Sequence, residues 1–189
     1  MVLPIVAYGH QSLRKETQKI EAGFPNLAET IANLFDTMYH AHGVGLAAPQ
    51  VNLNLRLFVV DGEPMEGLKQ GDESMRGFKR VFINPVILEE SGEEWAFREG
   101  CLSIPDVRED VFRKSTILIE YLDENLQKQT STFSGMKARI IQHEYDHLEG
   151  ILFTDHITPF RKQLLRKRLS RISKGDIGIS YPMKFPPVR

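Results

Sequence analysis

The segment QHEYDH, residues 142–147, places two histidines four positions apart with a glutamate directly after the first. On an α-helix, residues four apart lie on one face and one turn apart, so His143 and His147 can reach a single metal ion. Glu144 projects beside that face and can address a water molecule without binding the metal itself. The spacing predicts a metal site that activates water, and a solvated surface helix with the same residues is the alternative.

The third ligand decides between these alternatives, because a catalytic metal site generally takes three protein ligands and keeps one position open. The metzincin pattern HExxHxxGxxH fails, since Phe153 stands where its third histidine would be. A glutamate from a later helix, as in thermolysin-like proteases, is excluded because no glutamate follows Glu149. The remaining candidates are Cys101, His10, His40, His42 and His156. We expect His40 and His42 to be cap or surface groups, because residues two apart point to different faces of a helix.

Cys101 lies in the segment EGCLSIP, residues 99–105. Gly100 permits close approach of the backbone, and Ser103 and Pro105 indicate a rigid turn at the edge of a strand. A thiolate at this position would complete a Cys-His-His site. A free cysteine is usually a small buried apolar side chain, so Cys101 considered alone leaves both interpretations open.

The composition limits the classes of protein to consider. A chain of 189 residues with 41% hydrophobic content can bury one core, which predicts a single catalytic domain over residues 1–189. The net charge of −1 gives no overall field that favours DNA or a membrane surface. A single cysteine excludes an internal disulfide framework, and neither a long apolar run nor a signal-like start is present, so we expect a cytoplasmic protein.

The periodicity of the apolar residues predicts which elements position these groups. Helical spacing predicts helices at 25–41, 136–150 and 158–174, with Gly43, Gly150 and Gly175 placed to end them. Segments rich in β-branched and aromatic residues predict strands at 55–61, 81–90, 93–99, 115–124 and 128–135. Residues 61–80 are polar and predict a long surface loop, while 176–189 predict an extended, proline-rich tail. The order of elements favours an α+β fold with mostly antiparallel β-sheets around a central metal-binding helix, flanked by an N-terminal and a C-terminal helix.

Three segments, GVGLAAPQ (43–50), EGCLSIP (99–105) and QHEYDH (142–147), resemble in order the three signature motifs of peptide deformylase. The resemblance extends from about Ile5 to about Asp155. It implies a hydrolase that removes the formyl group from the N-terminal formylmethionine of newly synthesised polypeptides and releases formate. A metallo-endopeptidase and a binding module with a structural metal are the competing hypotheses. The lack of the usual protease ligands, and of a fourth structural ligand, weighs against both.

The resemblance also implies roles for individual residues. It makes Cys101, His143 and His147 the metal ligands, with ferrous iron as the usual ion and zinc, nickel or cobalt able to occupy the site. It makes Glu144 the acid and base. It makes the side chain of Gln50 and the backbone N–H of Leu102 the donors to the developing oxyanion.

Substrate binding is expected around the methionine side chain. The residues that the resemblance suggests for it are Val44, Gly45, Glu99, Gly100, Leu102, Arg108 and Ile140. The backbone of Gly45 would pair with an extended peptide, and Ile140 would be either a pocket wall or part of the core. Arg108 would bind the substrate backbone or form a surface salt bridge.

Two charged residues near the histidine motif need a separate explanation. Arg139 stands where the family often has an apolar residue, so its charge would either alter substrate preference at the rim of the pocket or extend to solvent. Asp146 is expected to form a structural hydrogen bond rather than to act in catalysis.

The third predicted helix is strongly basic. Residues 161–174 contain seven Lys or Arg residues and no acid, with Leu164, Leu165, Leu169 and Ile172 as an apolar side. The simpler interpretation is an amphipathic helix with a solvated basic face. The functional interpretation is docking on ribosomal RNA, near the place where formylated chains emerge.

Overall fold

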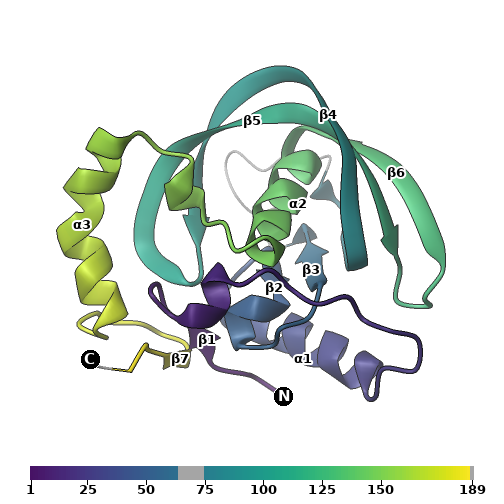
Figure 1. The fold of residues 1–189 in the computed structure, drawn as a ribbon, viewed down its shortest axis with the longest axis horizontal. Coiled ribbons are helices and arrows are strands. Elements are labelled where there is room, and N and C mark those ends of the chain that lie inside the picture. Colours follow the sequence, from purple (N-terminus) through teal and green to yellow (C-terminus); the bar gives the residue numbers. More distant parts are fainter. Residues whose placement is uncertain (64–74, 188–189) are drawn as a thin grey trace.

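The computed structural model describes residues 1–63 and 75–187. Its α-helices are α1 (Leu27–His40), α2 (Gly135–Leu148) and α3 (Pro159–Ser173), and its short 3₁₀ helices are η1 (Gln11–Arg14), η2 (Ala48–Val51) and η5 (Phe153–Asp155). Its strands are β1 (Ile5–Val6), β2 (Gly45–Ala47), β3 (Leu57–Asp61), β4 (Lys79–Cys101), β5 (Ile104–Leu122), β6 (Lys128–Ser134) and β7 (Met183–Lys184). The predicted α+β class, with mostly antiparallel strands around a central helix, is confirmed (Figure 1).

The main sheet has five strands in the order β2-β3-β4-β5-β6, and all of its neighbouring pairs are antiparallel. The predicted strands 81–90 and 93–99 form one long bent strand, β4, rather than two. The bend contains a register shift between Ser91 and Glu94, where Gly92 adopts a φ of +77°. Such bulges bend a strand without ending it, and β4, β5 and β6 therefore curve around α2 (Figure 1).

Helix α2 lies against the concave side of this sheet. Its buried residues Ala138, Ile141 and Leu148 belong to a cluster that contains Phe58 and Phe82. The helix ends as predicted, because Gly150 has a φ of +71° and the following N–H of Ile151 donates to the carbonyl of Asp146 at 2.9 Å. One face of α2 and its C-terminal end are therefore held by contacts with the protein. A different face, which carries His143 and His147, is directed at the end of β4.

Helix α1 begins later and ends earlier than its periodicity predicted. It starts at Leu27 rather than Pro25, because Asn26 has a left-handed φ of +56° that is not helical. It ends at His40, since His42 takes a left-handed φ of +55° and the N–H of Gly43 bonds back to the carbonyl of Met38 at 2.8 Å. Both histidines are exposed at this helix end, as expected for surface groups.

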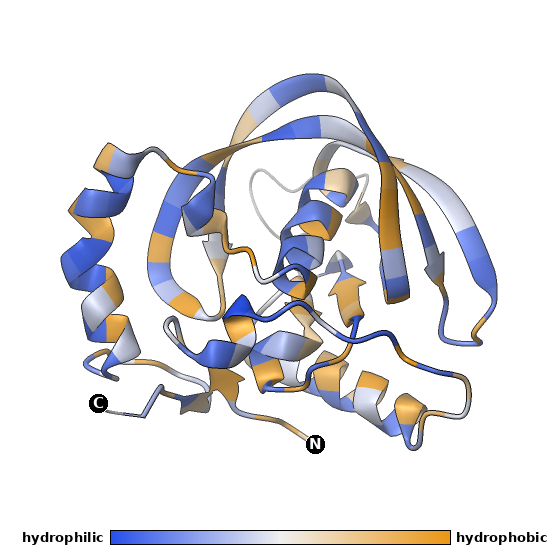
Figure 2. Ribbon diagram, in the orientation of Figure 1, coloured by the Kyte–Doolittle hydropathy of each residue, from blue (hydrophilic) through white to orange (hydrophobic). Residues whose placement is uncertain are grey.

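The C-terminal region consists of α3 and a tail that returns to the N-terminal strand. Helix α3 matches its predicted bounds, and the N–H of Arg161 donates to the side chain of Thr158 at its start. Leu169 and Ile172 are buried, but Leu164 is 58% exposed, so the apolar side is narrower than expected. Figure 2 accordingly shows α3 as mostly hydrophilic. In the described part of the tail, β7 pairs in parallel with β1.

Most of the predicted 61–80 loop cannot be compared with the structure, because residues 64–74 lie outside the described residues. Of its described residues, Asp61 ends β3, and Lys79 and Arg80 begin β4. No helix among the described residues is both long and apolar enough to span a lipid bilayer.

Candidate metal centre

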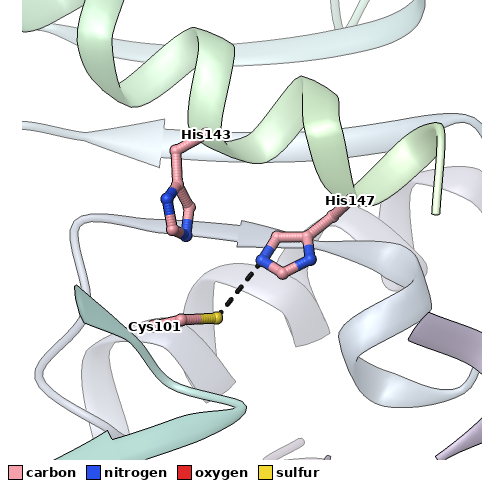
Figure 3. Close-up of side chains that lie close together, drawn as sticks. All are labelled: Cys101, His143 and His147. Carbon is pink, nitrogen blue, oxygen red and sulfur yellow. Dashed lines mark hydrogen bonds between the residues drawn. The ribbon is translucent and has the colours of Figure 1, made fainter. Parts of the chain in front are cut away.

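Three ligand-type side chains converge between the end of β4 and helix α2 (Figure 3). Cys101 is the last residue of β4, and His143 and His147 lie one turn apart on α2. One ligand atom from each of the three lies within 4.8 Å of the others, and Cys101 Sγ is 3.3 Å from His147 Nε2. Within residues 1–63 and 75–187 this is the group of His, Cys, Asp and Glu side chains that could hold a metal ion. Of the five open candidates for a third ligand, Cys101 is the one that the tertiary structure places beside both histidines.

The donor set fits a transition metal. Two imidazoles and one thiolate are the ligands that iron, zinc, cobalt and nickel accept, and three protein ligands leave a coordination position open. Burial opposes ionisation of the Cys101 thiol, but the neighbouring His147 and His143 outweigh it and lower the pKa of Cys101 to about 5. The thiolate that a metal requires is therefore favoured at neutral pH.

A buried carboxylate holds one of the histidines in place. The Nδ1 atom of His143 lies 2.8 Å from Glu99 Oε2, and a proton donated there leaves Nε2 free to bind a metal. Burial would raise the pKa of Glu99, but hydrogen bonds from His143 and Arg113 outweigh it and keep that pKa well below its ordinary value. Glu99 therefore stays ionised and orients the ring.

Two buried arginines complete the surroundings of Glu99. Nε of Arg113 donates to Glu99 Oε1 at 2.7 Å, and Nη1 of Arg139 donates to the same oxygen at 2.9 Å. Arg113 also donates to Asp146 at 2.8 Å, and Asp146 accepts from His156 at 2.8 Å. The structural hydrogen bond expected for Asp146 is present, and it also accounts for His156.

These contacts favour a different role for the Glu99 side chain from the substrate binding predicted for it. Its side chain is 4% exposed, and both carboxylate oxygens accept hydrogen bonds from protein groups. Those bonds leave the carboxylate no free position for a peptide. The carboxylate lies behind His143 instead, where its hydrogen bond orients the imidazole ring.

Arg139 also differs from its prediction. It is 2% exposed, so it neither extends to solvent nor lies at a pocket rim. Its guanidinium donates to the carbonyls of Val111 at 2.9 Å and Trp95 at 2.5 Å, and it lies over the Trp95 ring at 4.4 Å. Paired with Glu99, it ties α2 to β4 and β5. Arg113 was not among the residues predicted from the sequence. The available signal was its position as a cation among the alternating inward positions of a strand, where a buried charge requires a partner.

Glu144 is buried beside the metal ligands, with 4% of its surface exposed. Its Oε2 atom has no hydrogen-bond partner among the described residues. Burial, together with the negative charges of Cys101 and Glu99, raises the pKa of Glu144 to about 7 against the opposing effect of the two histidines. Gly45 lies against this carboxylate so closely that a Cβ at residue 45 would be 2.4 Å from Oε1. The side chain is thus confined, and one oxygen remains free for an exogenous proton donor or acceptor.

Gln50 directs its amide nitrogen toward the same site. It lies in η2, where Oε1 accepts from the N–H of Ala47 at 2.8 Å. Its Nε2 is 3.5 Å from Cys101 Sγ and 3.3 Å from Ser103 Oγ. Leu102 and Ser103 form the turn between β4 and β5, so the Leu102 backbone directly follows the cysteine ligand.

The remaining predicted substrate residues surround this group on three elements. Gly45 lies on β2, the terminal strand of the sheet order, so one edge of this strand pairs with no other strand among the described residues. Val44 is partly buried against the cluster that contains Ile140, and Ile140 itself is 7% exposed, which favours a core position. Gly100 pairs with Arg108 across the β4–β5 hairpin. Arg108 is exposed and forms no ion pair with any described residue, so the surface salt bridge considered for it is absent there.

Comparisons with known proteins agree with this geometry. The family model described as polypeptide deformylase matches residues 2–163. A peptide deformylase of Christiangramia forsetii is 55% identical over 190 residues, covering 98% of this chain and 97% of its own. One from Flavobacterium psychrophilum is 54% identical over 191 residues, covering 99% of this chain and 98% of its own. A crystal structure of a peptide deformylase from Legionella pneumophila superposes with a TM-score of 0.80 at 33% identity, covering 93% of this chain and 98% of the other.

Proposed function

This chain belongs to the peptide deformylase family, and from that premise we propose which of its residues carry out the family's reaction. The enzyme is a hydrolase that removes the formyl group from the N-terminus of nascent polypeptides. The observation that carries the assignment of residues is the convergence of Cys101, His143 and His147 with a buried carboxylate, Glu144. Its Oε2 atom has no hydrogen-bond partner in the described part of the chain.

Cys101, His143 and His147 would hold one divalent ion. When bound, such an ion lowers the pKa of water and polarises the formyl carbonyl. Water thereby becomes a better nucleophile and the formamide a better electrophile. We assign ferrous iron as the ion in the cell, and zinc, nickel or cobalt as ions that could replace it in purified protein. A Cys-His-His set accepts all four, so availability decides between them.

Glu144 would move the proton. Its free oxygen accepts a proton from the attacking water and returns it to the departing amine, because collapse of the tetrahedral intermediate requires a protonated leaving group. The confinement of this carboxylate by Gly45 supports the assignment, since a proton shuttle needs a fixed position more than a strong base.

Gln50 Nε2 and the Leu102 N–H would donate to the oxygen that becomes negative in the tetrahedral intermediate. The Gln50 amide is 1% exposed and already fixed through Ala47, so it need not reorganise during the reaction. Leu102 would contribute through its backbone, which the rigid turn after Cys101 orients.

The peptide would bind as an extended strand beside β2, with backbone hydrogen bonds to Gly45 and Gly100. The methionine side chain would lie near Val44, Leu102 and Ile140. The exposed guanidinium of Arg108, without an ion pair in the described structure, would be available to a carbonyl of the substrate. The metal site, the sheet edge and the tail would then operate as a single catalytic domain over residues 1–189.

Docking on the ribosome through α3 is a further part of the proposal, in a cytoplasmic enzyme. Four of the seven basic side chains in 161–174 are engaged in ion pairs within the protein, namely Arg161, Lys162, Arg168 and Arg171. Charge available to RNA would therefore come mainly from Arg166, Lys167 and Lys174. Co-sedimentation with ribosomes should weaken when Arg166, Lys167 and Lys174 are neutralised together, and unchanged co-sedimentation would remove this part of the proposal.

The assignment of residues is tested by formate release from a formyl-Met tripeptide, using protein purified without oxygen. The acetyl-Met peptide serves as the substrate control, and the Glu144→Ala variant tests the acid and base. We expect release from the formyl peptide alone, and a loss in the variant on the order of 10² to 10⁴ in kcat with metal content retained. Near-normal turnover of Glu144→Ala, or loss of its metal, would contradict the role given to Glu144.

A further inference from the structure

The turn formed by Leu102 and Ser103 is held by hydrogen bonds from distant parts of the chain. The side chain of Gln50 reaches Ser103 Oγ at 3.3 Å, and the N–H of Tyr8 donates to the Ser103 carbonyl at 2.9 Å. The hydroxyl of Tyr181 donates to the Leu102 carbonyl at 2.8 Å. Tyr181 lies in the C-terminal tail, beyond the residues that the family model matches.

The tail is itself anchored where it carries Tyr181. The next residue, Pro182, accepts at 2.9 Å from the N–H of Ile5, and the carbonyl of Lys184 accepts at 2.9 Å from the N–H of Ala7. These bonds belong to the parallel pairing of β7 with β1. The tyrosine is also partly buried against the core cluster beneath β2 and β3. The backbone hydrogen bonds of the tail and the packing of the Tyr181 ring therefore hold its hydroxyl in a defined position.

We propose that Tyr181 is a positioning residue for deformylation: its hydroxyl fixes the Leu102 residue so that the Leu102 N–H stays aimed at the developing oxyanion. Two backbone dihedrals separate the carbonyl and the N–H of one residue, so a bond to the carbonyl restricts the direction of the N–H. The inference rests on the proposed role of the Leu102 N–H. It gives the C-terminal tail a part in the reaction, although the tail contributes none of the metal ligands.

The hydroxyl is suited to act as a donor throughout the working pH range. Burial raises the pKa of Tyr181, and the negative charges of Cys101 and Asp106 raise it further. The proton needed for the bond to Leu102 is therefore retained. The partner is a carbonyl, which cannot donate in return, so removing the hydroxyl leaves it without this bond.

The test compares Tyr181→Phe with Tyr121→Phe. The hydroxyl of Tyr121 forms no hydrogen bond with described residues, and its ring packs on Phe82. Tyr121 lies at the opposite end of β5 from the Cys101–Ile104 turn, so it controls for loss of a tyrosine hydroxyl. The measurements are kcat and KM for the formyl peptide, metal content, the thermal midpoint, and backbone amide hydrogen exchange of residues 101–104. We expect Tyr181→Phe to lower kcat roughly 5-fold, which corresponds to one neutral hydrogen bond. KM and metal content should stay near those of Tyr121→Phe, the thermal midpoint should fall by only about 2–4 °C for the lost hydrogen bond, and the 101–104 amides should exchange faster.

Each other outcome overturns the proposal. Unchanged exchange at 101–104 would mean that Tyr181 does not hold the turn. Faster exchange with unchanged kcat would mean that the order of the turn does not serve catalysis, and a raised KM with unchanged kcat would assign Tyr181 to substrate binding. A wild-type protein that releases no formate would instead refute the proposed function, and the inference would fall with it.

Discussion

Gly45 offers a steric test of the mechanism, because its missing side chain makes room for Glu144. A Cβ at residue 45 would lie 2.4 Å from Glu144 Oε1 and 2.8 Å from both Cδ and Cγ. Comfortable contacts between non-bonded heavy atoms are about 3.5 Å, so Gly45→Ala should displace the carboxylate by roughly 1 Å. Glu144 is buried and cannot simply rotate into solvent.

The displacement should appear in turnover rather than in folding. Moving a catalytic group by about 1 Å can cost on the order of 10² in rate, and complete loss of a positioned acid and base costs about 10² to 10⁴. We therefore expect Gly45→Ala to lower kcat at least 10²-fold, with metal content retained. The backbone at Gly45 has no left-handed φ, so alanine introduces no backbone strain there.

Formate release under saturating and subsaturating formyl peptide separates the two possible effects. A damaged proton shuttle lowers kcat, whereas a damaged peptide-binding edge raises KM. Gly178→Ala is the matched control, because a Cβ at Gly178 would meet no atom within 4 Å. If Gly45→Ala kept kcat within about threefold of the wild type, either the carboxylate would not be confined by Gly45 or it would not be the acid and base.

Further predictions concern the oxyanion, the buried charges and the metal. Gln50→Ala should lower kcat roughly 10²- to 10³-fold with little change in metal affinity, and unchanged turnover would return Gln50 to a structural role. Arg139→Met should lower the free energy of unfolding by about 3 kcal/mol, because it removes one of the two buried arginines that bond Glu99 and leaves the carbonyls of Val111 and Trp95 without this donor. Urea denaturation measures this, and a loss below about 1 kcal/mol would contradict it. The pKa of Asp155 is lowered because hydrogen bonds from Arg14 and Lys162 outweigh its burial, so its contribution to stability should be present above its ordinary pKa of 3.8 and lost as pH falls below that value. The stability difference between Asp155→Asn and wild type should accordingly shrink in acid, and a difference independent of pH would refute the assignment. Removing the metal with a chelator should lower the thermal midpoint, because a ligand that binds only the folded state stabilises it, and re-addition of zinc should restore it.

Several elements were predictable because their information is local in sequence. The helical spacing and the glycine cap of α2, and the Thr158–Pro159 start of α3, each depend on residues within a few positions of one another. The pairing of His143 with His147 follows from the geometry of one helix. These features do not require knowledge of which segments meet in space.

Other features were wrong or open because they depend on contacts between distant segments. Arg139 was expected at the surface, but Glu99 lies 40 positions earlier in the chain, and only the fold brings the two buried charges together. The same holds for Glu99, whose neighbours on β5 and α2 occupy both of its oxygens. Periodicity predicts which side chains of a segment face the core. It carries no information about which residues of other segments they contact there.

The sequence by itself determined the helix that carries His143, Glu144 and His147, because one helical turn brings these side chains to one side. It also limited the third ligand to a few candidates. Only the tertiary structure selected Cys101, by curving β4 and β5 around α2 until the end of β4 meets the helix. The physical reason is that ligand convergence is a property of chain packing: burying the apolar face of α2 against the sheet sets the distance between the thiol and the two imidazoles.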